Sequence, residues 1–128
     1  MDVRWLPAAA MRAIHAELMA EFGGPEARVD EDLLAATLAR PRQGQHDEDA
    51  KTDLATLAAA YGHGFARNHP FTDGNKRMAL ASMDVFLRLN GHRLTAPEIE
   101  AVIVIRQLAA GELDEASLAE WVRRHMTV

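Results

Sequence analysis

The chain has no cysteine, so it can form neither a disulfide framework nor a zinc site with thiolate ligands. It has no run approaching the roughly 18 apolar residues that a membrane-spanning helix needs. Its N-terminus also lacks the basic segment and short apolar stretch of a secretory signal. We therefore expect a soluble cytoplasmic protein.

Excess positive charge is absent too. The formal net charge is −5 and the isoelectric point is about 5.6, which argues against nonspecific binding of nucleic acid. The cations of interest are local, at Arg67, Lys76 and Arg77. A small cationic spot on an acidic protein suits a phosphorylated ligand better than a duplex.

What the sequence does contain is helical periodicity. Its 128 residues are 48% hydrophobic, enough for one domain, residues 1–128, with a core of its own. Apolar residues recur at spacings of three and four, and no segment sustains period-two alternation. We expect a single compact all-α domain of about six helices, the first over residues 8–22. A lone helix histidine such as His15 is usually a packing or surface residue.

Several residues mark helix ends. Asp30 and Asp114 are suited to N-cap two helices, and Thr95 with Glu98 has the form of a capping box. Pro41 predicts the end of the helix that Asp30 begins. Residues 93–95 could form a short extended piece.

Two expected helices have unusual compositions. Residues 51–67 contain Gly62 and Gly64, which are unfavourable inside a helix and indicate close approach of another backbone. His63 between them we expect to be a packing residue. Residues 74–90 are apolar on nearly every side, which predicts a central buried helix.

The longest polar stretch lies at residues 40–49. A solvated connector accounts for such a composition, since some long loops only connect. A flap over a binding site, at residues 42–49, accounts for it equally well, because binding residues concentrate on loops. The sequence alone favours neither interpretation.

A second polar cluster, at residues 68–77, directly precedes the apolar helix. His69 is the natural general base, because a histidine of ordinary pKa is largely neutral near pH 7. Asp73 offers the hard oxygen ligand that Mg²⁺ prefers, alongside water and substrate phosphates. We expect this loop to be the active site.

The other residues of the loop suit an anion. Gly74 allows close approach of the backbone, and the amides near Gly74 and Asn75 can form an anion hole at the helix N-terminus. Asn75 adds a side-chain donor. Lys76 supplies a compact charge, and Arg77 a fork that matches phosphate.

Two other interpretations remain open at this point. The loop could be structural, with a hydrogen bond between His69 and Asp73 and the remaining polar groups capping the helix or solvated. A mononuclear hydrolytic metal site would need further ligands. The candidates, without diagnostic spacing, are His46, Asp47 and Asp49.

Residues 69–77, His-Pro-Phe-Thr-Asp-Gly-Asn-Lys-Arg, resemble the H-x-F-x-D-[AG]-N-K-R signature of Doc (death-on-curing) toxins, a branch of the Fic fold. Further Doc-like stretches are residues 14–24, 38–41, 64–68 and 87–95, so the resemblance covers nearly the whole chain. It implies a single helical Fic/Doc domain whose site loop precedes a central helix.

The resemblance also implies an activity. Fic proteins generally carry glycine where Lys76 stands and transfer AMP from ATP to a protein hydroxyl. Doc toxins of type II toxin–antitoxin systems instead transfer the γ-phosphoryl group to a threonine of the translation machinery, notably elongation factor Tu. A lysine at this position places its side chain and its charge where the α-phosphate would otherwise lie. The nucleotide then binds in the reverse orientation, with its γ-phosphate toward the incoming hydroxyl.

Carried over by position, the resemblance makes His69 the base and Asp73 the holder of Mg²⁺. Residues 74–77 hold the phosphates of ATP. Phe71 anchors the loop in the core, and the flap aligns the target segment. Met78, where relatives often have threonine, lies outside the motif and affects only the packing behind the loop.

The absence of an inhibitory motif implies how the protein is regulated. Self-inhibited Fic proteins carry [ST]-x-x-x-E-[GN], and no glutamate of this chain fits that pattern. Restraint would then come from an antitoxin of prevent-host-death type whose tail binds an exposed groove. We expect no nucleic-acid or membrane partner. The alternatives are an AMP or other nucleotide transferase, which Lys76 disfavours, and a catalytically idle binding module.

Overall fold

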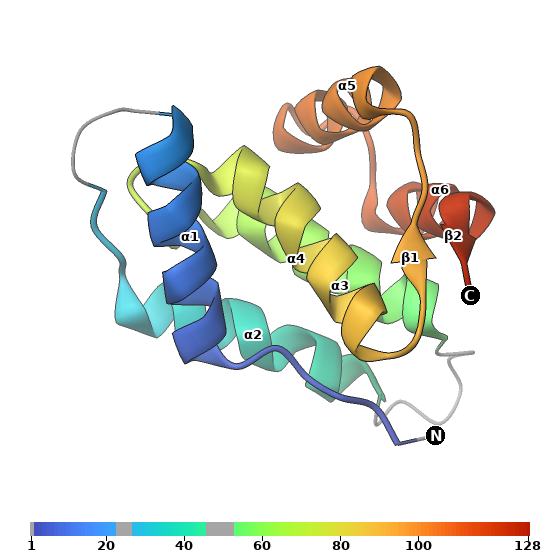
Figure 1. The fold of residues 1–128 in the computed structure, drawn as a ribbon, viewed down its shortest axis with the longest axis horizontal. Helices are drawn as coiled ribbons and strands as arrows, with labels where there is room; N and C mark the ends of the chain where they lie inside the picture. Colours follow the sequence, from blue (N-terminus) through green and yellow to red (C-terminus); the bar gives the residue numbers. More distant parts are fainter. Residues whose placement is uncertain (1, 23–26, 46–52) are drawn as a thin grey trace.

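The computed structural model describes residues 2–22, 27–45 and 53–128, which form six helices and one pair of short strands (Figure 1). The elements, in chain order, are α1 (Ala8–Phe22), α2 (Glu31–Gln45), α3 (Leu54–Asn68), α4 (Asn75–Leu89), β1 (Arg93–Leu94), α5 (Glu98–Ala109), α6 (Glu115–His125) and β2 (Met126–Thr127). The predicted all-α domain is confirmed.

Helix α3 occupies the centre, packed against α2, α4, α5 and α6, with ten of its residues buried. Its two glycines lie where neighbouring helices come close. A Cβ atom on Gly62 would lie 2.6 Å from Sδ of Met83 on α4. A Cβ atom on Gly64 would lie 2.9 Å from Cγ2 of Thr37 on α2. The glycines do lie at tight helix packing, but the prediction of another backbone was wrong, because the nearest atoms belong to side chains.

Helix α4 runs beside α3 and buries one face, including Met78, Met83 and Phe86. The burial of Met78 fits its expected place behind the loop. The other face reaches the surface, where Leu89 is 39% exposed. The helix after the loop is therefore internal on one side only, and α3 is the more deeply buried helix.

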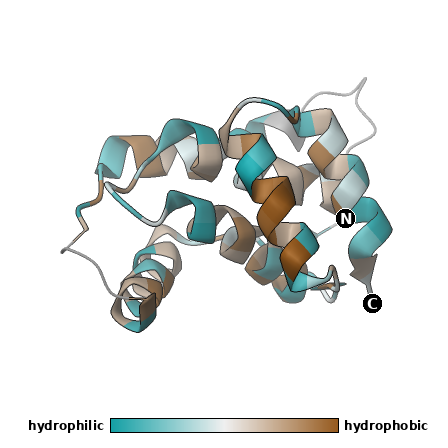
Figure 2. Cartoon of the chain, turned by 90° about the horizontal axis from the view of Figure 1, so that it is seen from above, coloured by the Kyte–Doolittle hydropathy of each residue, from teal (hydrophilic) through white to brown (hydrophobic). Residues whose placement is uncertain are grey.

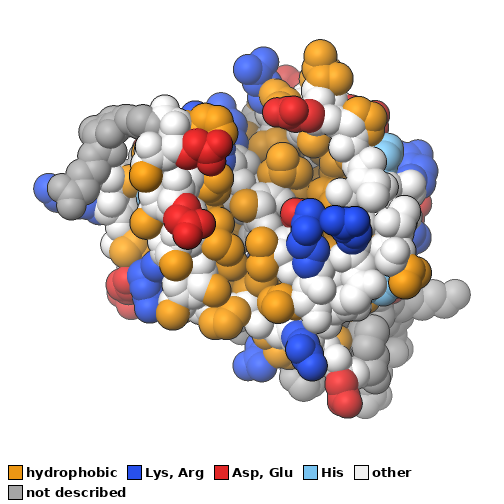
Figure 3. All heavy atoms as spheres, viewed as in Figure 1, with side chains coloured by type: hydrophobic (Ala, Val, Ile, Leu, Met, Phe, Trp, Pro, Cys, Tyr) orange, Lys and Arg blue, Asp and Glu red, His pale blue; other side chains and the backbone are white. Residues whose placement is uncertain are grey.

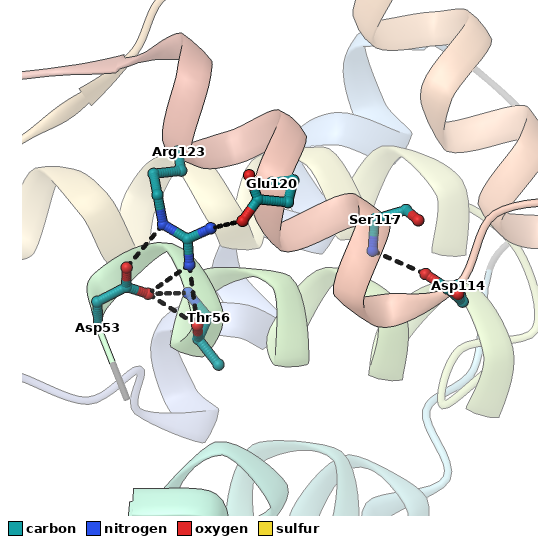
Figure 4. Close-up of polar contacts among 6 residues, drawn as sticks. All are labelled: Asp53, Thr56, Asp114, Ser117, Glu120 and Arg123. Carbon is teal, nitrogen blue, oxygen red and sulfur yellow. Dashed lines mark hydrogen bonds and ion pairs between the residues drawn. The ribbon is translucent and has the colours of Figure 1, made fainter. Parts of the chain in front are cut away.

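The predicted aspartate caps are present. The Asp30 carboxylate accepts a hydrogen bond from the Leu33 N–H at 3.1 Å, at the start of α2. The Asp114 carboxylate accepts one from the Ser117 N–H at 2.7 Å, at the start of α6 (Figure 4). Each satisfies an N–H group that a helix N-terminus leaves free.

Three predicted helix boundaries were wrong. Helix α3 begins at Leu54, after its cap Asp53, and not at residue 51. Helix α2 continues through Pro41 to Gln45. The proline lacks a helical hydrogen bond but is buried, so packing offsets that loss. Thr95 does not cap α5, since its N–H and hydroxyl both donate to the His125 carbonyl, at 2.7 and 2.8 Å. Helix α5 begins later, at Glu98.

The short extended piece is confirmed. Strand β1 pairs antiparallel with β2, with Arg93 opposite Thr127 and Leu94 opposite Met126. This pairing ties the end of the described chain to the segment after α4.

A polar network joins the N-terminal end of α3 to α6 (Figure 4). The Asp53 carboxylate caps α3 by accepting from the Thr56 N–H at 2.8 Å. It also pairs with Arg123, whose Nε lies 2.8 Å from Oδ2. Arg123 contacts Glu120 as well. The Arg123 hydrogen bond is the main cause that lowers the pKa of Asp53 to about 2.

In Figure 2, where the chain is coloured by hydropathy, helix α5 carries the strongest hydrophobic colouring. Its Ile99 and Ile103 side chains are exposed. Within the described ranges, however, no helix combines the length and apolar character needed to cross a membrane.

Candidate active site

The loop between α3 and α4 is held by two left-handed backbone residues. Helix α3 ends at Asn68, and His69 follows with φ 51° and ψ 58°. Gly74 has φ 83° and directly precedes α4. A positive φ reverses the chain sharply, and glycine adopts it without steric strain. The exposed His69 side chain thus lies at one end of a tight loop, and the N-terminus of α4 lies at the other.

Asn75 braces this loop from inside. Its side chain accepts from the Phe71 N–H at 3.1 Å and donates to the Phe71 carbonyl at 2.6 Å. The same amide nitrogen lies 3.4 Å from Nδ1 of His69. Asn75 is only 7% exposed. Its side-chain N–H groups, which we expected to bind a ligand, are used in these contacts. Its backbone N–H remains at the first position of α4.

Phe71 is the buried anchor that the motif predicted. Its ring stacks on Phe65 of α3, with centroids 6.4 Å apart and an interplanar angle of 8°. On its other side the ring stacks on His15 of α1, with centroids 3.7 Å apart at 9°. The loop is therefore fixed to both helices through one aromatic side chain.

His15 also reaches the loop backbone. Its Nε2 lies 2.8 Å from the Asp73 carbonyl, and because a carbonyl only accepts, this nitrogen carries the proton. The ring is 6% exposed. The expectation of a packing residue was right about its burial but missed its contact with the site.

A short extended segment lies on the other side of the loop. The Asp30 N–H donates to the Pro70 carbonyl at 2.7 Å, and the Thr72 N–H donates to the Arg28 carbonyl at 2.9 Å. These bonds flank an antiparallel bridge between Val29 and Phe71. In this type of bridge the N–H and C=O of the bridged residues point outward. Those of Phe71 meet Asn75, whereas those of Val29 have no partner among the residues that the structure describes.

A pocket of about 570 Å³ opens beside the loop, between α4 and α5. The loop and α4 line it with His69, Thr72, Asp73, Gly74, Asn75, Lys76, Arg77 and Leu80, and α5 lines it with Val102, Ile105 and Arg106. All six predicted site residues therefore meet in one pocket, while their chemical roles stay predictions. Arg67, expected to share this charge, does not line it and donates to the Ala109 carbonyl at 3.3 Å instead.

The α5 wall was missed by the sequence reasoning. Ile105 and Arg106 each lie about one helix turn after Val102, so the three share a face of α5. No motif marked them, because α5 lies far from the loop in sequence and only tertiary packing brings it there. Arg106 adds a third cation to Lys76 and Arg77.

A second pocket of about 520 Å³ lies beside the extended segment. Its lining comprises Arg28, Val29, Asp30, Leu33 and the loop residues 69–72. His69 and Thr72 line both pockets. The histidine therefore lies between two hollows, one rich in cations and one beside a strand edge.

The charged side chains of the first pocket differ in how they are engaged. The Asp73 carboxylate accepts from its neighbour's N–H, that of Gly74, at 2.8 Å. The Arg77 guanidinium lies over the Phe22 ring, 4.6 Å from its centroid. Lys76 is exposed and has no ion-pair partner within the described ranges. A bound anion would meet two exposed cations at the start of α4.

The other candidates lie elsewhere. The flap predicted at residues 42–49 was wrong at its start, because Arg42 continues α2 and lies over the Trp5 ring, 5.2 Å from its centroid. The rest of that flap, residues 46–49, lies outside the described residues. The proposed metal ligands His46, Asp47 and Asp49 lie outside the described residues. Over residues 2–22, 27–45 and 53–128, no three His, Asp or Glu side chains are grouped to hold a metal.

His63 lies away from both pockets, as a packing residue would. Its Nδ1 is 3.4 Å from the Glu115 carboxylate, which also pairs with Arg40 at 2.5 Å. Burial is the main cause that lowers the pKa of His63.

The model of the Fic/DOC family matches residues 5–87, which include the loop, helices α1 to α3 and most of α4. The chain belongs to the Fic/DOC family. It is 34% identical over 113 residues to the protein kinase Doc of Escherichia phage P1, covering 88% of this chain and 87% of that protein. It is 44% identical over 75 residues to the toxin Doc of Mycolicibacterium smegmatis, covering 59% of this chain and 58% of the toxin.

Family membership confirms the resemblance that residues 69–77 indicated. The chain is a homologue of proteins named Doc toxin and Doc protein kinase. Arg106 and the rest of the α5 wall lie outside the residues that the family model matches.

Proposed function

We propose that this protein is a Doc-type kinase toxin. It transfers the γ-phosphoryl group of ATP to a threonine hydroxyl of a translation factor of the elongation factor Tu class, and so arrests translation. The observation that carries the proposal is the place of His69 between the two pockets. A general base that activates a target hydroxyl toward a nucleotide must reach both substrates.

The first pocket binds the nucleotide. Lys76 and Arg77 hold the phosphates, with the backbone N–H groups of Gly74 and Asn75 at the N-terminus of α4. Leu80, Val102 and Ile105 provide an apolar wall for the nucleoside. Asp73 suits Mg²⁺, which uses few carboxylates beside water and phosphate and, when bound, neutralises charge that develops on the phosphates.

The second pocket receives the target. The outward N–H and C=O of Val29 can pair with an extended segment of the target, as in strand addition to an open edge. The bridge to Phe71 holds Val29 beside the loop, so a side chain of the paired segment enters the pocket next to His69. This role, predicted for residues 42–49, is thereby assigned to residues 28–30.

The transfer needs one proton movement. His69 accepts the proton of the threonine hydroxyl as its oxygen bonds to the γ-phosphorus, and the bond from that phosphorus to the β-bridging oxygen breaks. Phosphothreonine and ADP are the products. The cations of α4 stabilise the charge on the phosphoryl oxygens, which is the main protein contribution to such reactions.

Transfer of AMP is the second candidate, supported by Gly74, which retains part of the Fic pattern. Lys76 disfavours it, because a cationic side chain occupies the position that the α-phosphate would need. A catalytically idle binding module is disfavoured because each motif position holds a competent residue and all six line one pocket.

The toxin is restrained by an antitoxin of prevent-host-death type. Figure 3 shows hydrophobic side chains gathered between α1 and α4. Ile14, Leu18 and Phe22 follow one stripe of α1, and Phe22 is 56% exposed. Such an apolar surface suits an amphipathic antitoxin segment. If the protein alone expressed harmlessly while fully active on its target, this part of the proposal would fail.

The test uses ATP labelled at either the α or the γ phosphate, with Mg²⁺ and a bacterial extract. We expect label to enter a protein band from the γ position only, and to be lost with His69→Asn. Entry of α label would establish AMP transfer instead. A Lys76→Gly variant sharpens the choice, because removing the lysine should admit α label if the side chain sets the nucleotide's orientation.

A further inference from the structure

The contact between His15 and the loop has a consequence for the anion hole. The Asp73–Gly74 peptide is trans, as is every peptide bond within the described residues. In a trans peptide the C=O and N–H point in opposite directions. The side chain that binds the Asp73 carbonyl therefore also sets the direction of the Gly74 N–H.

That carbonyl is turned toward α1, where Nε2 of His15 donates to it at 2.8 Å. The Gly74 N–H consequently points away from α1, to the side where the Asp73 carboxylate accepts it at 2.8 Å. Asp73 and Gly74 both line the first pocket. If the carboxylate turns to another ligand, the N–H is left directed toward a bound anion.

Two further contacts restrict any other arrangement. The His15 ring is stacked on Phe71, which is itself buried, so the ring cannot tilt out of its plane without losing this contact. A Cβ atom at position 74 would lie 3.3 Å from Nε2 of His15 and 3.0 Å from Sδ of Met19. Helix α1 therefore closes on the back of the loop at the residue whose N–H faces the pocket.

We propose that His15 is a positioning residue of the active site. Its Nε2–H holds the Asp73–Gly74 peptide plane so that the Gly74 N–H serves as an anion donor. This inference rests on the proposed function for the identity of the anion, a phosphate of ATP. The peptide orientation itself does not depend on that function.

The test uses two substitutions of His15 to separate the effect of its Nε2–H donor from the effect of its aromatic ring. His15→Gln keeps an amide donor near Nε2 but loses the aromatic face. His15→Phe keeps the face stacked on Phe71 and loses the donor. His92→Phe, outside both pockets, controls for the same exchange elsewhere. Each variant is compared with the whole wild-type chain by melting temperature, by the Gly74 amide signal in NMR, and by γ-label transfer with ATP and Mg²⁺.

We expect the more stable of the two His15 variants to be the less active one. The Phe variant should melt closer to the wild type than Gln does, yet lose about a hundredfold in transfer, as misplacement of a binding group can. The Gln variant should retain transfer within about threefold, because the donor that sets the peptide plane is kept. The Gly74 amide signal should shift or broaden in the Phe variant and stay in place in Gln.

If His15 only fills space, transfer follows stability, the Phe variant is the more active one, and its Gly74 signal does not move. Either result overturns the proposal. If the wild type transfers no γ label, the kinase function fails, and the Gly74 signal still decides the role of His15.

Discussion

Helix α3 has a polar cluster at each end, and the two clusters differ in whether their charges are paired. At the N-terminal end, Asp53 caps the helix and pairs with Arg123, which also contacts Glu120 (Figure 4). At the C-terminal end, Lys76 and Arg106 line a pocket and have no ion-pair partner within the described ranges.

The pairing of charged groups distinguishes the scaffold from the candidate site. Charges that satisfy one another contribute to folding and leave nothing for a ligand. Cations that line a pocket without an ion-pair partner remain available to a bound anion. Both clusters are charged, so charge alone identifies neither, and the partners of each group decide its role. Four substitutions test this contrast.

The largest effect is expected at His69. The His69→Asn substitution removes the proposed base, while asparagine tolerates the left-handed backbone at this position. We expect kcat for phosphoryl transfer to fall by about 10²–10⁴, the range typical of a lost general base. The melting temperature should stay near the wild-type value, because the side chain is exposed. Retained activity with an unchanged fold would remove His69 from the mechanism.

Gly74 comes next, with a matched control at Gly91. Both residues have a positive φ, 83° and 82°, but only Gly74 is crowded, whereas nothing lies within 4 Å of a Cβ atom on Gly91. Alanine at either site introduces backbone strain of about 1 kcal/mol. Gly74→Ala should in addition weaken ATP binding by about tenfold, measured by calorimetry. Equal binding by the two variants would count against the close fit of the loop.

A smaller effect is expected at Arg106. Arg106→Ala removes one exposed cation from the α5 wall, so ATP affinity should fall by about three- to tenfold, corresponding to about 1 kcal/mol. Arg124→Ala, an exposed arginine of α6 that lines neither pocket, is the control. If the two variants bind ATP alike, α5 does not contribute charge to the nucleotide site.

The smallest effect is expected at Asp53, in folding stability alone. The folded pKa of about 2 lies below the usual value of 3.8, so the stabilisation is complete above pH 4. It is lost as the pH falls from about 4 to 2. Because 48% of the Asp53 side chain is exposed, solvent screening limits the contribution to about 1 kcal/mol or less.

In Asp53→Asn, the free energy of unfolding, measured by urea denaturation, should therefore fall less between pH 4 and pH 2 than in the wild type. Phosphoryl transfer at neutral pH should be unchanged. A loss of transfer without a loss of stability would erase the contrast between the two ends of α3.

The sequence predicted the local features well. Helix α1 begins and ends as its periodicity indicated, and Asp30 and Asp114 cap as expected. The six candidate site residues meet because they lie close together within residues 69–77, in the loop and the first turn of α4. Each of these depends on residues near one another in the chain.

What the sequence did not predict depends on distant packing. Arg106 reaches the pocket through the placement of α5, and His15 reaches Asp73 through the placement of α1. Val29 meets Phe71 across the loop. Pro41 stays helical because its ring is buried. Local propensity contains none of this information.

The most direct test of the central claim is the mass of purified elongation factor Tu after incubation with the protein, ATP and Mg²⁺. We expect the gain of one phosphoryl group on a threonine, abolished by His69→Asn and unaffected by Asp53→Asn. A gain of one adenylyl group, or a phosphoryl gain that survives His69→Asn, would contradict it.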